Sequence, residues 1–280
     1  MFKLINKIFS LFMICVIVLT TGFGYARYIE SYDYRTRQET VATPLISAGS
    51  EVKILIISDT HFSKWYTPEN FSEAVGSINE IQADYVLFLG DLFDYLENYS
   101  GSVPEISRCL GLIQAKKGKY AVFGNHDYGG GAEFKYEDIM AAGGFTVLRN
   151  SSQLLQEDNI NLIGLDDMLI GYGDAGCAGD LAREGCLNLL MCHEPDVADQ
   201  ILNYNVNLMV SGHTHGGQVN LPKITDMLLP TYGTKYVKGV YDFGNAAATK
   251  LIVTSGLGMT KLPLRFLSPP DITLITLKGI

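Results

Sequence analysis

All five histidines of this 280-residue chain lie in short polar clusters, each directly after a run of apolar residues. A single histidine beside a strand is usually a hydrogen-bonded structural residue. Five histidines at equivalent places, accompanied by aspartates and an asparagine, instead indicate a shared metal site. The clusters are SDTHF (58–62), GDLFD (90–94), GNHDY (124–128), CHEPD (192–196) and SGHTHGG (211–217).

The residue types in these clusters define the metals that such a site would hold. Imidazole, carboxylate and amide ligands suit Mn, Fe, Zn or Co, whereas structural zinc sites usually contain thiolates. Asp59 and His61 are two residues apart, and so are His213 and His215. In an extended segment, side chains at this spacing point to the same side. The pattern therefore predicts a catalytic metal site into which both pairs point.

The apolar runs predict the elements that position these clusters. In the first half of the chain, runs at 52–58, 84–90 and 119–124 alternate with segments of helical periodicity at 68–82 and 103–117. This alternation is typical of βαβ units, and strands that are apolar almost throughout are usually covered on both faces.

The second half has little helical periodicity apart from 194–204. Its apolar runs lie at 159–165, 186–192, 206–212, 249–255 and 271–277. We therefore expect an α/β fold in which two mixed β-sheets pack face to face with flanking helices. Ligands of such sheets collect beyond the carboxyl ends of strands, where the polar clusters fall.

The amino-terminal segment differs from the rest of the chain, because nineteen residues between Lys7 and Arg27 carry no charge. This length just spans the apolar core of a bilayer. Three interpretations are open: an uncleaved single-pass anchor in the cell membrane, which we favour, a secretory signal cleaved near Ala26, or a buried helix. Basic residues flank the segment at both ends, so the side of the membrane on which the domain lies stays open.

Composition points to one globular domain after this segment. Apolar residues make up 47% of the chain, which is enough for a substantial core. We divide the chain into an anchor or signal segment (1–30), a linker (31–50) and a single domain (51–280). The polar sequence of 31–50 is also compatible with an edge strand.

Charge and cysteine content exclude some classes of function. The net charge is −9, so no nucleic-acid partner is expected. The five cysteines lack zinc-finger or disulfide-framework spacing. Cys177 and Cys186 flank a polar loop and would pair only in an oxidising compartment. The sequence carries no signal for an oligomeric state.

Taken together, the clusters resemble the motifs of the calcineurin-like metallophosphoesterases: DxH, GDxxD, GNHD, a separate histidine and GHxH. All five occur here in that order. Later segments, among them GHTHGGQVNLP, YVKGVY, SGLGMTKLPLRF and PPDITLITL, resemble a bacterial membrane-associated branch of that family. The resemblance implies a metallophosphoesterase domain at 51–280 that acts on a phosphate-ester substrate.

Carried over residue by residue, the resemblance implies two divalent metal ions. The matching ligand positions are Asp59, His61 and His215 for one ion, Asn125, His193 and His213 for the other, and Asp91 as a bridge. Two such ions polarise a phosphoryl group and activate water for in-line attack.

Three more residues are candidates for catalytic roles beside these ligands. His126 would protonate the leaving oxygen or stabilise charge on the phosphoryl group. Asp127 would fix the ring of His126, and Asp94 would support the ligands from behind. In the alternative, Asp94 and Asp127 cap the helix or loop that follows each of them.

Two basic residues in the segment 259–270 bear on the substrate. Lys261 and Arg265 lie among apolar residues and are candidates for binding a lipid phosphate, Arg265 in a bidentate manner. The alternative is a covered strand end with an ordinary ion pair.

Three functions are compatible with these observations. The first is hydrolysis of a membrane-proximal, lipid-linked substrate such as UDP-2,3-diacylglucosamine, whose pyrophosphate is cleaved by enzymes that this branch resembles. The second is a broad phosphodiesterase or phosphomonoesterase acting on soluble nucleotides or phosphoproteins. The third is a metal-binding scaffold without catalysis, against which the intact set of ligand candidates argues.

Overall fold

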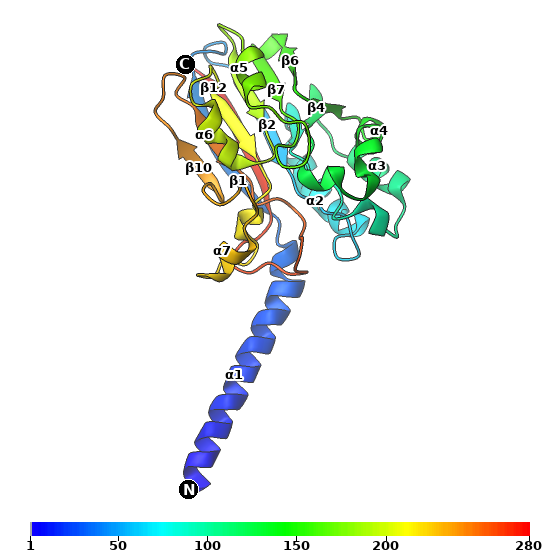
Figure 1. The fold of residues 1–280 in the computed structure, drawn as a ribbon, viewed down its shortest axis with the longest axis vertical. Helices are drawn as coiled ribbons and strands as arrows, with labels where there is room; N and C mark the ends of the chain where they lie inside the picture. The colour runs from blue at the N-terminus through cyan, green and yellow to red at the C-terminus, as the bar shows by residue number, and fades with distance from the viewer. Residues whose placement is uncertain (1) are drawn as a thin grey trace.

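The computed structural model describes residues 2–280, and in it a long amino-terminal helix leads into an α/β domain (Figure 1). The α-helices are α1 (Phe2–Tyr28), α2 (Pro68–Glu80), α3 (Val103–Gly111), α4 (Tyr136–Ala142), α5 (Gly176–Asp180), α6 (Ala198–Ile201) and α7 (Ile224–Leu228). The short 3-10 helices are η1 (Glu30–Tyr32), η2 (Leu96–Asn98), η3 (Asn125–Phe134), η4 (Gln156–Asp158), η5 (Pro195–Val197) and η6 (His215–Gly217). The strands are β1 (Arg35–Thr43), β2 (Glu51–Ile57), β3 (Tyr85–Phe88), β4 (Gly118–Ala121), β5 (Thr146–Val147), β6 (Ser151–Leu155), β7 (Ile160–Gly164), β8 (Leu187–Met191), β9 (Leu208–Ser211), β10 (Gly239–Asp242), β11 (Lys250–Val253) and β12 (Asp271–Gly279).

The strands form two six-stranded mixed sheets, in the orders β1-β12-β2-β3-β4-β5 and β10-β11-β9-β8-β7-β6. The inner strands β2, β3 and β4 run parallel, as do β7, β8, β9 and β11. All eight predicted strands are present, and the predicted fold class, two mixed sheets with flanking helices, is confirmed.

Strand β2 illustrates why these sequences form buried strands. Its residues alternate between two cores: Ile54 and Ile56 belong to the cluster between the sheets, and Leu55 and Ile57 to the cluster under the outer helices. Because both faces are covered, both sets must be apolar, and this explains the continuous run. Helices α2, α3 and α4 cover the outer face of the first sheet, and α5 and α6 cover that of the second.

The segment 31–50 differs from the predicted linker. Strand β1 pairs in parallel with β12 over nine residues, from Arg35 opposite Asp271 to Thr43 opposite Gly279. Val41 is buried in the core between the sheets. The segment is therefore the edge strand that the sequence also allowed, and the domain begins before residue 51.

Helix α1 is long and apolar enough to cross a membrane, and its carboxyl end is built into the domain. Ala26 is buried, and its carbonyl accepts hydrogen bonds from the Arg265 backbone N–H (3.2 Å) and the Ser31 hydroxyl (2.8 Å). Glu30 is also buried, and its carboxylate accepts a hydrogen bond from the backbone N–H of Ser268 (2.7 Å). These bonds fix the end of α1 against the loop that contains Arg265.

Cys177 and Cys186, the pair considered for a disulfide, are both free thiols.

Candidate metal centre

The five polar clusters meet at one place because they follow neighbouring strands of both sheets. The clusters of residues 58–62, 90–94 and 124–128 come after β2, β3 and β4, and those of 192–196 and 211–217 come after β8 and β9. The carboxyl ends of these parallel strands lie at the same edge of the two packed sheets.

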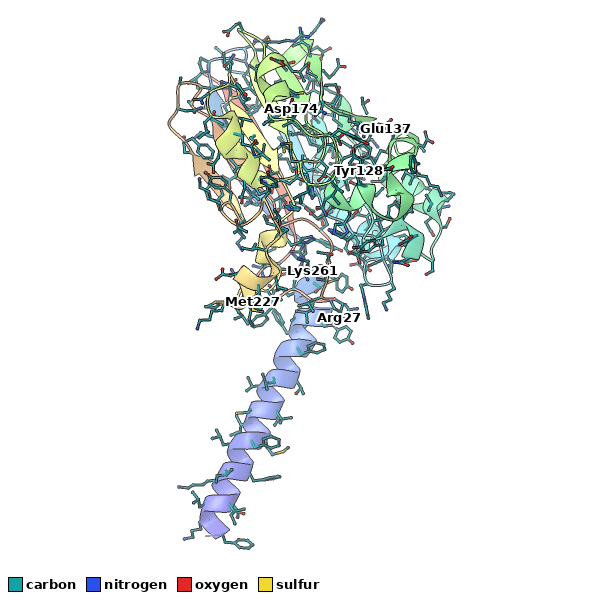
Figure 2. All side chains as sticks on the ribbon, viewed as in Figure 1. Arg27, Tyr128, Glu137, Asp174, Met227 and Lys261 are labelled. Atoms are coloured by element: carbon teal, nitrogen blue, oxygen red, sulfur yellow. The ribbon has the colours of Figure 1, made fainter. Side chains whose placement is uncertain are left out.

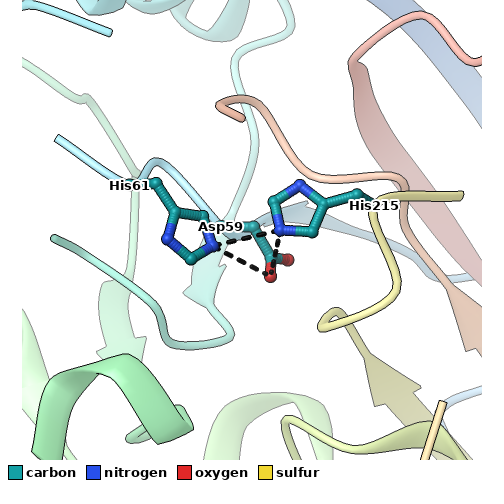
Figure 3. Close-up of side chains that lie close together, drawn as sticks. All are labelled: Asp59, His61 and His215. Carbon is teal, nitrogen blue, oxygen red and sulfur yellow. Dashed lines mark hydrogen bonds and ion pairs between the residues drawn. The ribbon is translucent and has the colours of Figure 1, made fainter. Parts of the chain in front are cut away.

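Asp59, His61 and His215 form the first group, with ligand atoms all within 4.8 Å of one another (Figure 3). The Nε2 atoms of His61 and His215 are 3.0 Å apart, and Asp59 Oδ1 lies 3.9 and 3.6 Å from them. Two imidazole nitrogens and a carboxylate at such spacing converge on a single point, as ligands of one cation do.

Asp91, His193 and His213 form the second group under the same distance limit. Asp91 Oδ2 lies 3.2 Å from His193 Nε2 and 3.4 Å from His61 Nε2, so this carboxylate stands between the two groups. The Asn125 amide oxygen and His193 Nε2 are buried without a hydrogen-bond partner. Buried polar atoms are rarely left unpaired, so these orphaned acceptors fit a bound cation.

Hydrogen bonds on the far side of each ring fix which imidazole nitrogen is available. His193 Nδ1 contacts the Leu89 carbonyl (2.6 Å), and His213 Nε2 contacts the Thr231 carbonyl (2.8 Å). Since a carbonyl only accepts, these nitrogens carry the proton and the opposite nitrogen is left with a lone pair. The main chain thereby orients both rings as ligands.

Burial and neighbouring charges shift the pKa values of the ligand candidates in different directions. Burial lowers the pKa of His213 to about 3, and burial together with His61 and Arg265 lowers the pKa of His215 well below its ordinary value. Burial opposes ionisation of Asp91, but His193, His126 and His61 hold the pKa of its carboxyl well below its usual range. Burial opposes protonation of His193, but Asp91 and Asp59 raise its pKa well above its ordinary value, so a cation that binds this ring displaces a proton.

The backbone around the centre is strained. Five of the seven ligand candidates have positive φ angles, namely Asp59 (52°), His61 (45°), Asp91 (60°), His213 (72°) and His215 (52°). Residues with a Cβ rarely adopt this conformation, which costs about 1–3 kcal/mol each and is concentrated at functional sites.

Glycines allow the close approach of main chain to these ligands. A Cβ at Gly124 would collide with the Asp91 carboxylate and the ring of His193, and one at Gly212 with the side chains of Ser58 and Asp59. Any larger residue at these two positions would push ligands apart. Close packing against the ligands therefore explains the glycine that begins each of the GNHD and GHTH motifs.

His126 lies beside the ligands and faces the cavity over the centre. Its backbone N–H donates to Asp91 Oδ1 (2.8 Å), and its Nδ1 contacts the Asp94 carbonyl (2.6 Å). Burial opposes protonation, but Asp91 and then the Asp94 carbonyl and carboxylate raise the pKa of His126 above its ordinary value. These contacts fix the position of the His126 ring at the cavity.

The prediction that Asp127 fixes the ring of His126 is wrong. The buried Asp127 carboxylate accepts hydrogen bonds from the backbone N–H groups of Asp91 (2.7 Å), Leu92 (2.9 Å) and Gly124 (2.9 Å). All three donors precede Asp127 in the chain, so it does not cap the segment that follows it either, and instead holds the two ligand loops together. Asp94 lies 3.6 Å from His61 Nδ1 and accepts from the Thr260 hydroxyl (2.9 Å), which fits an acid behind the ligands.

Arg265 lies where no substrate reaches it, contrary to the substrate-binding prediction. Its side chain is fully buried, and its guanidinium donates to main-chain carbonyls of three segments of chain. The acceptors are the carbonyls of His215, Ser255, Gly256, Gly258 and Ser268. Arg265 therefore positions the loops around the centre.

A cavity of about 220 Å³ opens over the ligands and is lined on its outer side by Leu228, Pro230 and Lys261. Lys261 is exposed, and its ammonium donates to the Leu228 carbonyl (3.2 Å). This position suits the predicted contact between Lys261 and a substrate phosphate.

Sequence reasoning missed the loop that carries Leu169 to the cavity wall. Asp167, at its start, accepts hydrogen bonds from the backbone N–H groups of Leu169, Ile170 and Gly171. The only sequence signal was the pair of acids at 166–167 followed by glycines, which is typical of many surface turns.

We expect His215→Ala and His213→Ala to remove different metal ions, because each histidine belongs to a different group. With Mn supplied, each variant is expected to retain about one of two equivalents by elemental analysis. Electron paramagnetic resonance should change from a coupled Mn pair to an isolated ion in both. Two normal equivalents in either variant would contradict the division into two sites.

Comparisons with known proteins agree with this geometry. A family model described as calcineurin-like phosphoesterase matches residues 52–217. YkuE, an uncharacterized metallophosphoesterase of Bacillus subtilis, is 41% identical over 264 residues, which cover 92% of this chain and 90% of that protein. Phosphodiesterase YaeI of Escherichia coli is 30% identical over 268 residues, which cover 93% of this chain and 94% of that protein. A transmembrane protein with metallophosphoesterase domain from Danio rerio is 29% identical over 81% of this chain and 53% of its own length. The chain belongs to the calcineurin-like phosphoesterase family and is a metal-dependent phosphoesterase.

Proposed function

We propose that this enzyme hydrolyses a phosphate ester or pyrophosphate bond in a lipid-linked substrate at a membrane surface, UDP-2,3-diacylglucosamine being one example. The observation that carries this proposal is the position of the cavity. Leu228 and Lys261 line it and contact each other, and the loop that contains Lys261 is bonded to the end of α1 through the Arg265 N–H and the Ala26 carbonyl. A substrate whose lipid part stays in the bilayer would approach from this side.

The contacts of α1 support an uncleaved anchor in the cell membrane. Cleavage after Ala26 would remove the carbonyl that accepts hydrogen bonds from Arg265 and Ser31, both of which are buried. The Arg265 N–H would keep its second acceptor, Ser31 Oγ (2.9 Å), but the buried Ser31 hydroxyl would lose its acceptor, which costs about 1–3 kcal/mol. Retention of α1 therefore stabilises the loop next to the metal centre.

The chemistry follows from the donor set, in which Asp59, His61 and His215 would hold one cation and Asn125, His193 and His213 the other, with Asp91 between them. Their nitrogen and oxygen atoms suit Mn, Fe, Zn or Co, and two such ions supply phosphoryl polarisation and water activation. His126 provides a proton at Nε2 for the leaving oxygen. Lys261 binds a non-reacting phosphate oxygen at the cavity mouth.

A phosphodiesterase acting on soluble substrates is the second candidate, favoured by the relative named phosphodiesterase that is 30% identical over nearly the whole chain. In this alternative, α1 would hold the enzyme at the membrane but would have no part in the choice of substrate.

The two candidates differ in the substrate they prefer. We would incubate the purified full chain with Mn in lipid vesicles and supply either UDP-2,3-diacylglucosamine or a soluble diester, bis(p-nitrophenyl) phosphate. The proposal expects release of UMP and lipid monophosphate. It also expects Lys261→Ala to raise KM for the lipid substrate more than Lys135→Ala, a matched exposed lysine before α4 that does not line the cavity. Turnover of soluble esters without turnover of any lipid-linked substrate would support the alternative.

His126→Ala is expected to lower kcat by about 10²–10⁴-fold, because proton transfer to the leaving group is lost. The deficit should be smaller for p-nitrophenyl esters than for alkyl esters, since p-nitrophenolate departs without a proton. Metal content should not change. Equal deficits for both leaving groups would contradict the role as acid.

A further inference from the structure

Four exposed apolar side chains lie on α7 and on the loop that contains Arg265. We call Ile224, Met227, Leu262 and Leu267 the α7 patch. Their exposed fractions are 44%, 83%, 40% and 54%, respectively. Met227 is exposed as fully as any large apolar side chain of residues 2–280, and exposed apolar side chains gathered together usually mark an interaction site.

The α7 patch has a fixed position relative to α1. Lys261 donates to the Leu228 carbonyl at the end of α7 (3.2 Å), and Asn220 N–H donates to the Phe266 carbonyl (2.8 Å). The same loop is bonded to α1 through the Arg265 N–H and the Ala26 carbonyl. Figure 1 shows α7 on the side of the domain from which α1 leaves, and Figure 2 shows Met227 and Lys261 close to the level of Arg27.

Residues typical of a membrane boundary surround the point where α1 enters the domain. The Arg27 guanidinium lies over the rings of Trp65 (5.0 Å) and Tyr28 (5.2 Å), and Trp65 is 39% exposed. Aromatic and basic side chains concentrate at the headgroup level of membranes. The 27-residue α1 is about 40 Å long, so a bilayer core of about 30 Å places these residues at its surface.

Three lysines around the α7 patch and the end of α1 outnumber the one exposed acid on α7, Asp226, although the chain as a whole carries −9. Lys223 precedes α7, Lys261 follows on the adjoining loop, and Lys64 lies over Trp65 (4.8 Å). All three are exposed. Lysines near the surface of a membrane are attracted to anionic lipid headgroups.

We propose that the α7 patch inserts into the headgroup region of the bilayer that holds α1, with Lys64, Lys223 and Lys261 on anionic headgroups. The patch is then a second membrane contact, which prevents the domain from tilting about α1. It also keeps the cavity wall at Leu228 and Lys261 against the lipid surface. This inference rests on the proposed anchor and does not depend on which substrate is hydrolysed.

The chain has a single tryptophan, which makes the proposal testable by fluorescence. The full chain is reconstituted in vesicles of phosphatidylcholine and phosphatidylglycerol with brominated acyl chains, which quench nearby tryptophan. Native Trp65 reports the end of α1. In a Trp65→Phe background, Met227→Trp reports the α7 patch, and Glu137→Trp is the control, because Glu137 is exposed and far from α1 (Figure 2).

We expect Met227→Trp to be quenched about as strongly as native Trp65 and several-fold more than Glu137→Trp. Quenching of Met227→Trp should fall when phosphatidylglycerol is omitted. If Trp65 is quenched and Met227→Trp is not, the α7 patch does not touch the bilayer and the inference is overturned. If neither is quenched, the anchor itself is wrong and the inference fails with it. Because no turnover is measured, neither outcome depends on the proposed substrate.

Discussion

Replacement of Asp91 by asparagine is expected to lower kcat/KM by at least about a thousand-fold, which corresponds to about 4 kcal/mol of transition-state stabilisation. Asp91 Oδ1 accepts the His126 backbone N–H, and Oδ2 faces the Nε2 atoms of both His61 and His193. In the asparagine variant the oxygen keeps the bond to His126. The amide NH₂ must then point toward the ligands, where it repels a cation instead of binding it.

Metal content and rate should fall together in this variant. Elemental analysis of the purified protein gives the first quantity, and steady-state kinetics on a p-nitrophenyl ester gives the second. Asp138→Asn is the matched control, because Asp138 is exposed in the first turn of α4 and lies away from the centre. An Asp91→Asn enzyme with full metal content and rate would show that Asp91 does not bridge the two groups.

Arg265→Met is expected to lower the free energy of unfolding by about 3–5 kcal/mol, the cost typical of breaking a buried charged network. Burial lowers the pKa of Arg265 to about 10, so the guanidinium stays charged at neutral pH. Methionine fills much of the space but leaves the carbonyls of Ser255 and Gly258 without donors and removes one of the donors to the His215 carbonyl. Part of the loss should appear as weaker metal binding, because His215 is a ligand candidate.

Denaturant unfolding of the full chain in detergent, followed by circular dichroism, measures this change. The stability of Arg265→Lys should lie between those of the unmodified chain and Arg265→Met, because lysine keeps the charge but has fewer donors. Arg183→Met, at an exposed arginine, should change stability by no more than about 0.5 kcal/mol. A stability for Arg265→Met equal to that of Arg183→Met would refute the positioning role.

The candidate centre was largely predictable, because each ligand candidate directly follows a strand whose apolar run is visible in the sequence. Parallel strands bring their carboxyl ends to one edge of a sheet. Recognising that Asp59, Asp91 and His193 each follow a strand is therefore enough to predict that they lie close together in space. The same reasoning produced eight strands close to their observed positions.

The predictions that were wrong concern residues whose partners are distant in sequence. Arg265 was misjudged because its acceptors are main-chain carbonyls, which any residue supplies, so no side-chain pattern marks them. Asp127 likewise bonds to main-chain N–H groups of residues 91 and 92. Strand β1 pairs with β12 at the opposite end of the chain, and its exposed residues give it a polar sequence like that of a linker.

The positive φ angles of Asp59, His61, Asp91, His213 and His215 link the stability of the chain to its metal centre. Each costs about 1–3 kcal/mol, which contacts elsewhere in the fold must offset. A cation held by these side chains would add binding free energy to the folded state alone, and so would stabilise the part of the backbone that is most strained without it.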